Sequence, residues 1–111
     1  MIRLRGTTDF LQMKLAGAIA TSNPSVYVSW RVMEGEQVVY RNEQVVALNG
    51  VTDVTLLGAT AAANQYLEVE KIQFVNTDTA AVTFILEHDD ATTETELAHV
   101  TVAVSETLIL E

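Results

Sequence analysis

The chain has 111 residues, of which 49% are hydrophobic and 19% charged, with one proline, five glycines and no cysteine. This length and composition predict a single domain over residues 1–111, large enough to bury a core without disulfide or metal staples. Without cysteine, disulfides, thiolate metal sites and cysteine nucleophiles are excluded. Six basic and fifteen acidic residues give a formal charge of −9, which argues against nucleic-acid or anionic-membrane partners.

Strand patterns dominate the first half of the chain. Residues 10–15 alternate apolar and polar side chains, as a half-buried strand does. Residues 25–33 are the clearest strand, with Val26, Val28, Trp30 and Val32 on the predicted core face and Ser25, Tyr27, Ser29 and Arg31 on the other. Glu34-Gly35-Glu36 predicts a hairpin turn into a strand over residues 37–41.

The second half continues the same way. An apolar run over 45–48 ends at Asn49-Gly50, which predicts a hairpin with 51–57 as the returning strand. Residues 58–65 predict a loop, with a helical turn over 59–63 as the alternative. Further strands are expected over 66–75, 81–87, 97–104 and 107–110, with Val82, Phe84 and Leu86 in the core. Seven to nine short antiparallel strands predict an all-β fold, a β-sandwich of jelly-roll-like type.

The N-terminal segment, residues 1–8, is either an arm or the first edge strand. Ile2 and Leu4 alternate with Arg3 and Arg5, and all six basic residues lie within the first 71 positions. We expect the arm: residues 1–5 dock on a neighbouring subunit or another protein rather than on the chain's own core. All four residues from Ile2 to Arg5 are therefore interface candidates.

Catalytic and metal-binding patterns are sparse. No nucleophile elbow, phosphate-binding glycine loop or paired-histidine zinc motif occurs in the sequence. The acidic stretch 87–96, which includes His88, is together with His99 the best place for a cation. If residues 97–104 pair with 81–87, we expect the two histidines to lie near each other at the end of that hairpin. A solvated acidic turn is the expectation we favour, so no catalytic, cofactor or metal residues are assigned.

Two further features concern surface residues. Glu68 and Glu70 fall on one face of a predicted strand, where an exposed acidic face is favoured over a pair of catalytic carboxylates. Tyr27, Arg31 and Tyr40 lie outside the apolar face of their hairpin. Because tyrosine and arginine concentrate binding energy at interfaces, these three complete the set of interface candidates.

Several segments resemble a family of small virion proteins of tailed bacteriophages. The similarity is carried by residues 8–23 (TDFLQMKLAGAIATSN), 49–57 (NGVTDVTLL), 75–83 (VNTDTAAVT) and Ser105-Glu106-Thr107-Leu108, where the family usually has glycine in place of Ser105. The segment 31–46 has no counterpart in this pattern, so partner specificity is expected there.

The resemblance implies a β-sandwich that coats or joins parts of a virion and is assembled in the host cytoplasm. A capsid decoration (cement) protein is the leading expectation, with head fibre, neck or tail accessory proteins as alternatives. Its implied partners are the major capsid protein or another virion protein and further copies of itself, a trimer being favoured over a dimer. A lectin-like sandwich or a jelly-roll hydrolase are the alternatives from other classes.

Overall fold

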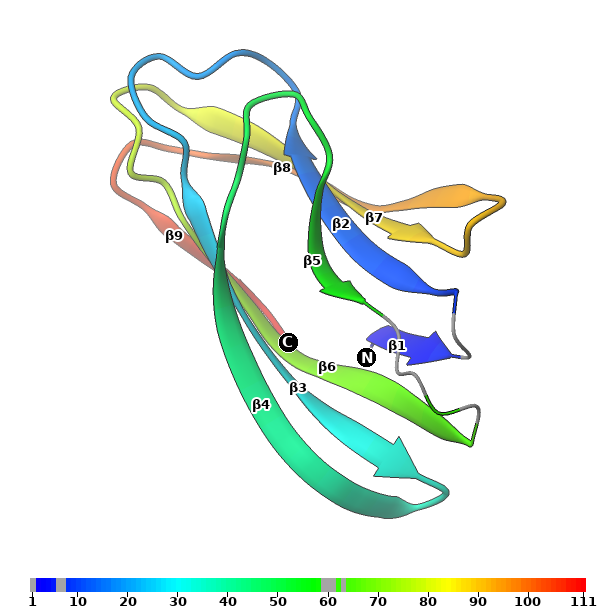
Figure 1. Ribbon diagram of the computed structural model, residues 1–111. Coiled ribbons are helices and arrows are strands. Elements are labelled where there is room, and N and C mark those ends of the chain that lie inside the picture. Colours follow the sequence, from blue (N-terminus) through cyan, green and yellow to red (C-terminus); the bar gives the residue numbers. More distant parts are fainter. Residues whose placement is uncertain (1, 6–7, 59–61, 63) are drawn as a thin grey trace.

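The computed structural model describes residues 2–5, 8–58, 62 and 64–111. In these residues the chain is an all-β sandwich of antiparallel strands, as the alternation predicts (Figure 1). The strands are β1 (Ile2–Arg5), β2 (Phe10–Leu15), β3 (Ser25–Glu34), β4 (Gln37–Ala47), β5 (Val54–Gly58), β6 (Gln65–Val75), β7 (Val82–Asp89), β8 (Glu94–Val102) and β9 (Thr107–Leu110). Within the described ranges no helix is long and apolar enough to cross a membrane.

The strands form two sheets that pack face to face. The first sheet has the order β1-β6-β3-β4, with β9 pairing β6 beyond the end of β1, and the second has the order β5-β2-β7-β8. Only the β3–β4 and β7–β8 connections stay within one sheet, so the chain passes repeatedly between the layers (Figure 1). Each layer is thereby tied to the other at both ends of the sandwich.

The core lies between the sheets at the positions that alternation predicts. The seven expected core residues are all buried: Val26, Val28, Trp30, Val32, Val82, Phe84 and Leu86. Phe74 of β6 contacts the other layer, with its ring centroid 4.8 Å from that of Phe84 in β7. These side chains supply the apolar burial that holds the two sheets together.

The Asn49-Gly50 turn forms, but the hairpin predicted around it is wrong. Gly50 has φ +52°, and Asn49 bridges Thr52. The strands on either side nevertheless belong to different sheets, because β4 pairs with β3 whereas β5 pairs with β2. The N–H of Leu15 donates to the Gly50 carbonyl (2.9 Å), so this turn is anchored by β2 and carries the chain between layers.

The N-terminal residues form an edge strand, and the expectation of an arm is wrong for Ile2–Arg5. β1 pairs with β6 in register, Ile2 opposite Val69 and Leu4 opposite Leu67. The Leu4 side chain is fully buried in the chain's own core, since alternation turns it inward once the strand is paired. Met1 lies outside the described residues, as do residues 59–61 and 63 of the predicted loop or helical turn.

A buried aspartate ties two loops together at one end of the sandwich. The Asp78 carboxylate accepts hydrogen bonds from the N–H groups of Ala20, Thr21, Ser22 and Thr79 at 2.8–3.2 Å. These bonds, that to the Ala20 N–H foremost, hold the pKa of Asp78 well below its usual range. The β2–β3 connection is thus fixed to the β6–β7 turn.

Asn76 completes this end of the sandwich. Its side-chain NH₂ donates to the carbonyl oxygens of Ala80, Val102 and Ala103 at 2.9–3.2 Å, and its Oδ1 accepts from the Asp78 N–H (2.9 Å). Polar atoms buried here therefore find partners within the chain. We call residues 76–79 with their partners the Asp78 junction.

Candidate interaction surface

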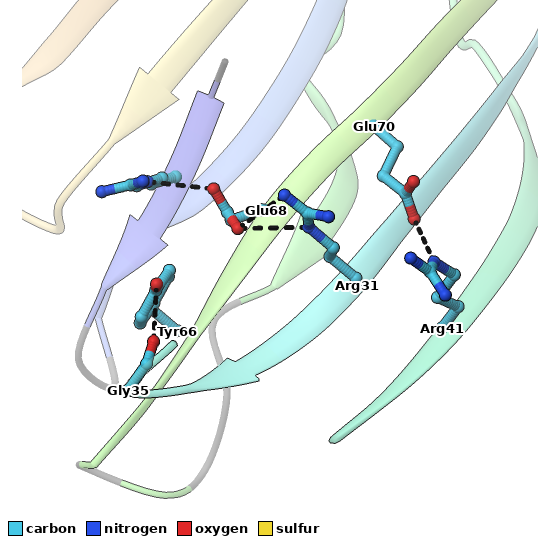
Figure 2. A network of polar contacts seen from close by, with 7 residues as sticks. Arg31, Gly35, Arg41, Tyr66, Glu68 and Glu70 are labelled. Atoms are coloured by element: carbon cyan, nitrogen blue, oxygen red, sulfur yellow. Dashed lines mark hydrogen bonds and ion pairs between the residues drawn. The ribbon is translucent and has the colours of Figure 1, made fainter. Parts of the chain in front are cut away.

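A row of charged side chains crosses the outer face of the first sheet. Register places Arg3 of β1 opposite Glu68 of β6, Glu68 opposite Arg31 of β3, and Arg31 opposite Arg41 of β4. Arg3, Glu68 and Arg31 point away from the core, because their neighbours along each strand pack into it. Arg41 lies on the same face because it is opposite Arg31. Figure 2 shows Arg31 directed toward Glu68 and Arg41 toward Glu70.

Glu68 is the centre of this row. Its Oε2 accepts from Arg3 Nε at 3.1 Å, and its Oε1 accepts from Arg31 Nε at 3.1 Å. The Glu68 side chain is only 4% exposed, whereas those of Arg3 and Arg31 are 48% and 25% exposed. The two guanidinium groups therefore compensate a buried carboxylate while presenting their remaining surface to solvent.

Glu70 is placed differently from Glu68. A bulge in the β3–β6 pairing puts Lys71 opposite Ser29 and Val69 opposite Trp30, so that Glu70 has no direct counterpart on β3. Its Oε1 lies 3.3 Å from Arg41 Nε of the next strand. The expectation of an exposed acidic strand face is wrong, since Glu68 is buried and both glutamates are paired with arginines.

Two tyrosines flank the charged row. The guanidinium carbons of Arg3 and Arg5 lie 5.4 and 5.5 Å from the centre of the Tyr66 ring, within the range of cation–π contacts. At the other end, Lys71 Nζ lies 5.8 Å from the Tyr27 ring centre. The Tyr27 hydroxyl donates to Glu43, and this hydrogen bond raises the pKa of Tyr27.

The charge of the chain is divided unequally between its surfaces. Five of the six basic residues of the sequence occupy the outer face of the first sheet, together with Glu43, Glu68 and Glu70. We call this surface the basic face and define it by Arg3, Arg5, Arg31, Arg41 and Lys71. The sixth, Lys14, lies on the second sheet, 3.6 Å from Glu87 and 4.0 Å from Asp53. Twelve acids lie outside the basic face, so an acidic molecule carries one surface of opposite sign.

The structure brings together four of the seven interface candidates. Arg3, Arg5, Tyr27 and Arg31 share the basic face. Ile2 and Leu4 turn toward the core instead, Leu4 completely and Ile2 partly. Tyr40 pairs with Val32, which places it on the opposite side of β4, where it is 55% exposed.

Sequence reasoning missed two members of the basic face and a tyrosine that packs against it. Arg41, Lys71 and Tyr66 were not singled out, although Arg31 and Arg41 flank the predicted hairpin turn and pair across it. The predicted hairpin therefore already indicated that Arg41 lies beside Arg31 on the same face. Lys71 and Tyr66 lie on β6, whose pairing with β3 joins segments far apart in the sequence.

The acidic stretch 87–96 comprises the end of β7, a turn over residues 90–93 and the start of β8. Asp90 accepts from the N–H groups of Thr92 (3.0 Å) and Thr93 (2.7 Å), and its pKa is lowered by its bonds to these residues, first of all by the Thr92 hydroxyl. His88 lies 3.3 Å from Asp9, and His99 lies 3.2 Å from Glu96.

The expectation that the two histidines meet is wrong. His99 stands opposite Ile85 in the β7–β8 pairing, whereas His88 stands opposite Thr95. Nowhere in the described part of the chain do three or more histidine or carboxylate side chains gather as metal ligands would.

Glu87 of β7 is a buried acid that is imperfectly paired. Its side chain is 9% exposed, and its Oε1 lies 3.6 Å from Lys14 Nζ without accepting a hydrogen bond from any described group. Burial raises the pKa of Glu87, and a contact with Asp53 adds to the shift.

Comparisons with known protein families, curated proteins and solved structures found no match to this chain.

Proposed function

We propose that this protein is a structural or assembly module that binds another protein through the basic face, as a component of a bacteriophage virion. A capsid decoration protein is the form we favour, with the major capsid protein as partner. The bacteriophage part of the proposal comes from the resemblance of segments 8–23, 49–57 and 75–83. The choice of the basic face as the binding surface, and its positive charge, come from the positions of the side chains in the fold.

One observation carries the binding part of this proposal. An acidic chain gathers five of its six basic residues on one face, interleaved with Tyr27 and Tyr66. Arginine and tyrosine dominate the energetics of protein interfaces, and opposite charge on a partner speeds and orients encounter. The surface therefore fits a protein partner that offers carboxylates, such as an acidic patch on a capsid subunit.

The virion role is tested with particles. Particles purified by density gradient from a lysate of the host that carries the gene are analysed by quantitative mass spectrometry. We expect mass spectrometry to find many copies of the chain per particle. An antibody against the chain should label the particle surface in electron micrographs. A chain found only in the soluble fraction would refute the virion role.

The basic face is tested by matched charge-neutralising variants added to particles that lack the chain. Arg5→Gln combined with Lys71→Gln should weaken particle binding at least about tenfold. Lys14→Gln, on the second sheet, should leave binding within about twofold of wild type. Equal effects of the two variants would contradict binding through the basic face.

A further inference from the structure

Strand β4 is an exposed edge of unusual length. It has eleven residues without proline, and all of its side chains except that of Val46 are exposed. Among the described residues no strand pairs with its far side, and Figure 1 shows it as the outermost strand of the first sheet. Native proteins usually shorten, charge or cover such an edge because it offers unpaired N–H and C=O groups to another chain.

The sequence of β4 is complementary to itself when read in the opposite direction. An antiparallel pair of two β4 strands centred on Asn42 places residues equally distant from position 42 opposite each other. Arg41 then faces Glu43 of the second copy, and Glu43 faces its Arg41. Val39 likewise faces Val45, and Val38 faces Val46, where Val39 lies at a bulge of β4 and has no counterpart on β3. Charges thus meet opposite charges, and valines meet valines.

The backbone of β4 suits this register. The Glu43 N–H donates to the Asn42 side chain at 2.8 Å, which places that N–H on the free side of the strand. Alternation then turns the N–H and C=O groups of Arg41 and Val45 to the same side. In the centred pair the Glu43 N–H exchanges the Asn42 side chain for the Arg41 carbonyl of the second copy. Arg41 and Glu43 of opposite copies then share both main-chain hydrogen bonds, whereas the two Asn42 residues form a non-hydrogen-bonded pair.

Exposed apolar side chains lie along the same strand. Val38, Val39, Tyr40 and Val45 are 40%, 46%, 55% and 69% exposed. In the centred pair each valine meets another valine, so pairing removes apolar surface from water at both ends of the strand. Charge complementarity and apolar contact therefore favour the same occupant, a second copy of this chain.

We propose that two copies of this protein pair β4 to β4, antiparallel, about a two-fold axis at Asn42. The first sheets of the two copies then become one continuous sheet, and the two basic faces join on one side of it. Two-fold pairing closes as a dimer, in place of the trimer that the resemblance favours. This inference goes beyond the proposed function, because it concerns the purified chain and holds or fails without a virion partner.

A disulfide tests the register. The chain has no cysteine, so Asn42→Cys introduces one thiol per copy at the axis, where a non-hydrogen-bonded pair has Cα atoms about 4.5 Å apart. Mild oxidation of the full chain should convert most of this variant to a covalent dimer on non-reducing gels. Gln44→Cys is the matched control, because in this register its two Cα atoms are separated by about 13 Å.

Charge exchange tests the pairing independently of any disulfide. Sedimentation equilibrium should show a wild-type dimer whose dissociation constant rises at least about tenfold in Arg41→Glu and in Glu43→Arg. The double variant Arg41→Glu/Glu43→Arg restores opposite charges across the axis and should return the constant to within about threefold of wild type. Circular dichroism and melting curves of each variant show whether it is folded.

Three outcomes would overturn the proposal. They are a wild-type chain that stays monomeric at concentrations up to about 1 mM, an oligomer that Gln44→Cys crosslinks as readily as Asn42→Cys, and an oligomer that the single charge variants leave unchanged. The second outcome would indicate another register and the third another occupied surface, such as the basic face itself.

Discussion

The Asp78 junction and strand β4 both contain polar residues, but those at the junction are bonded within the fold and those on β4 face solvent. At the junction, a carboxylate that is 4% exposed receives N–H groups from two loops, and its neighbour Asn76 satisfies three carbonyl groups. On β4, Arg41 and Glu43 are exposed and each has one side-chain partner, Glu70 and Tyr27 respectively. Buried polar groups therefore hold the fold, whereas exposed ones remain available to a second molecule.

Removing the charge at the junction is expected to give the largest effect. Asp78→Asn turns an amide NH₂ toward N–H groups that need an acceptor, so part-buried donors lose their partners. We expect the melting temperature to fall by more than about 10 °C. The measurement is thermal unfolding followed by circular dichroism.

Asp90→Asn is the matched control for this substitution. Asp90 also caps backbone N–H groups, but in an exposed turn, so its replacement should lower the melting temperature by no more than about 3 °C. Similar losses in the two variants would show that burial does not distinguish the junction from an ordinary turn.

The stability that the Asp78 junction contributes should decrease as the pH is lowered. The folded-state pKa of Asp78 is lowered, so the stability that it contributes is complete above its ordinary pKa of 3.8 and is lost as pH falls toward the folded value. Wild type should therefore lose more free energy of unfolding between about pH 6 and pH 3 than Asp78→Asn does. Glu87, whose pKa is raised, acts in the opposite direction in both proteins. Urea titrations at the two pH values measure the difference, and identical pH slopes would contradict the assignment.

Substitution of Glu68, at the centre of the charged row, should have an intermediate effect on the free energy of unfolding. Glu68→Gln removes the buried charge that Arg3 and Arg31 share, and we expect a loss of about 1–3 kcal/mol in the free energy of unfolding. Glu70→Gln is the control, because its partner Arg41 is 62% exposed and such pairs contribute at most about 1 kcal/mol. Urea denaturation at neutral pH compares the two, and a larger effect at Glu70 would place the centre of the row elsewhere.

The smallest effect on stability is expected on β4. Arg41→Glu should change the free energy of unfolding of the monomer by no more than about 0.5 kcal/mol, although it weakens the proposed dimer. Urea denaturation at protein concentrations well below the dissociation constant of the dimer measures the free energy of unfolding of the monomer alone. A large loss there would mean that Arg41 serves the fold in the way Asp78 does.

Local sequence signals were sufficient for most of the strands. Alternation over residues 25–33 identified the core positions of β3, because a paired strand with one dry face must turn every second side chain inward. Gly35 was recognised as a turn residue, and it has φ +61°, a conformation that glycine adopts without steric cost. The all-β class followed from these patterns alone.

The pairing partners of the strands, by contrast, depend on contacts between segments that are distant in sequence. Asn49-Gly50 signals a turn but does not say which strand receives the returning chain, and here β2 received it. Ile2–Arg5 is compatible with an arm or an edge strand until β6 is in place to pair with it. Glu68 reads as an exposed acid because its two arginines come from strands distant in the sequence, at positions 3 and 31.

The same distinction holds for the candidate surfaces. Neighbours along the chain set the alternation, the turn positions and the self-complementary order of residues on β4, so these features are visible in the sequence. Only the fold decided that five basic residues share one face and that β4 lies at the edge of its sheet. Sheet order is set by contacts between segments far apart in sequence, and no local pattern specifies those contacts.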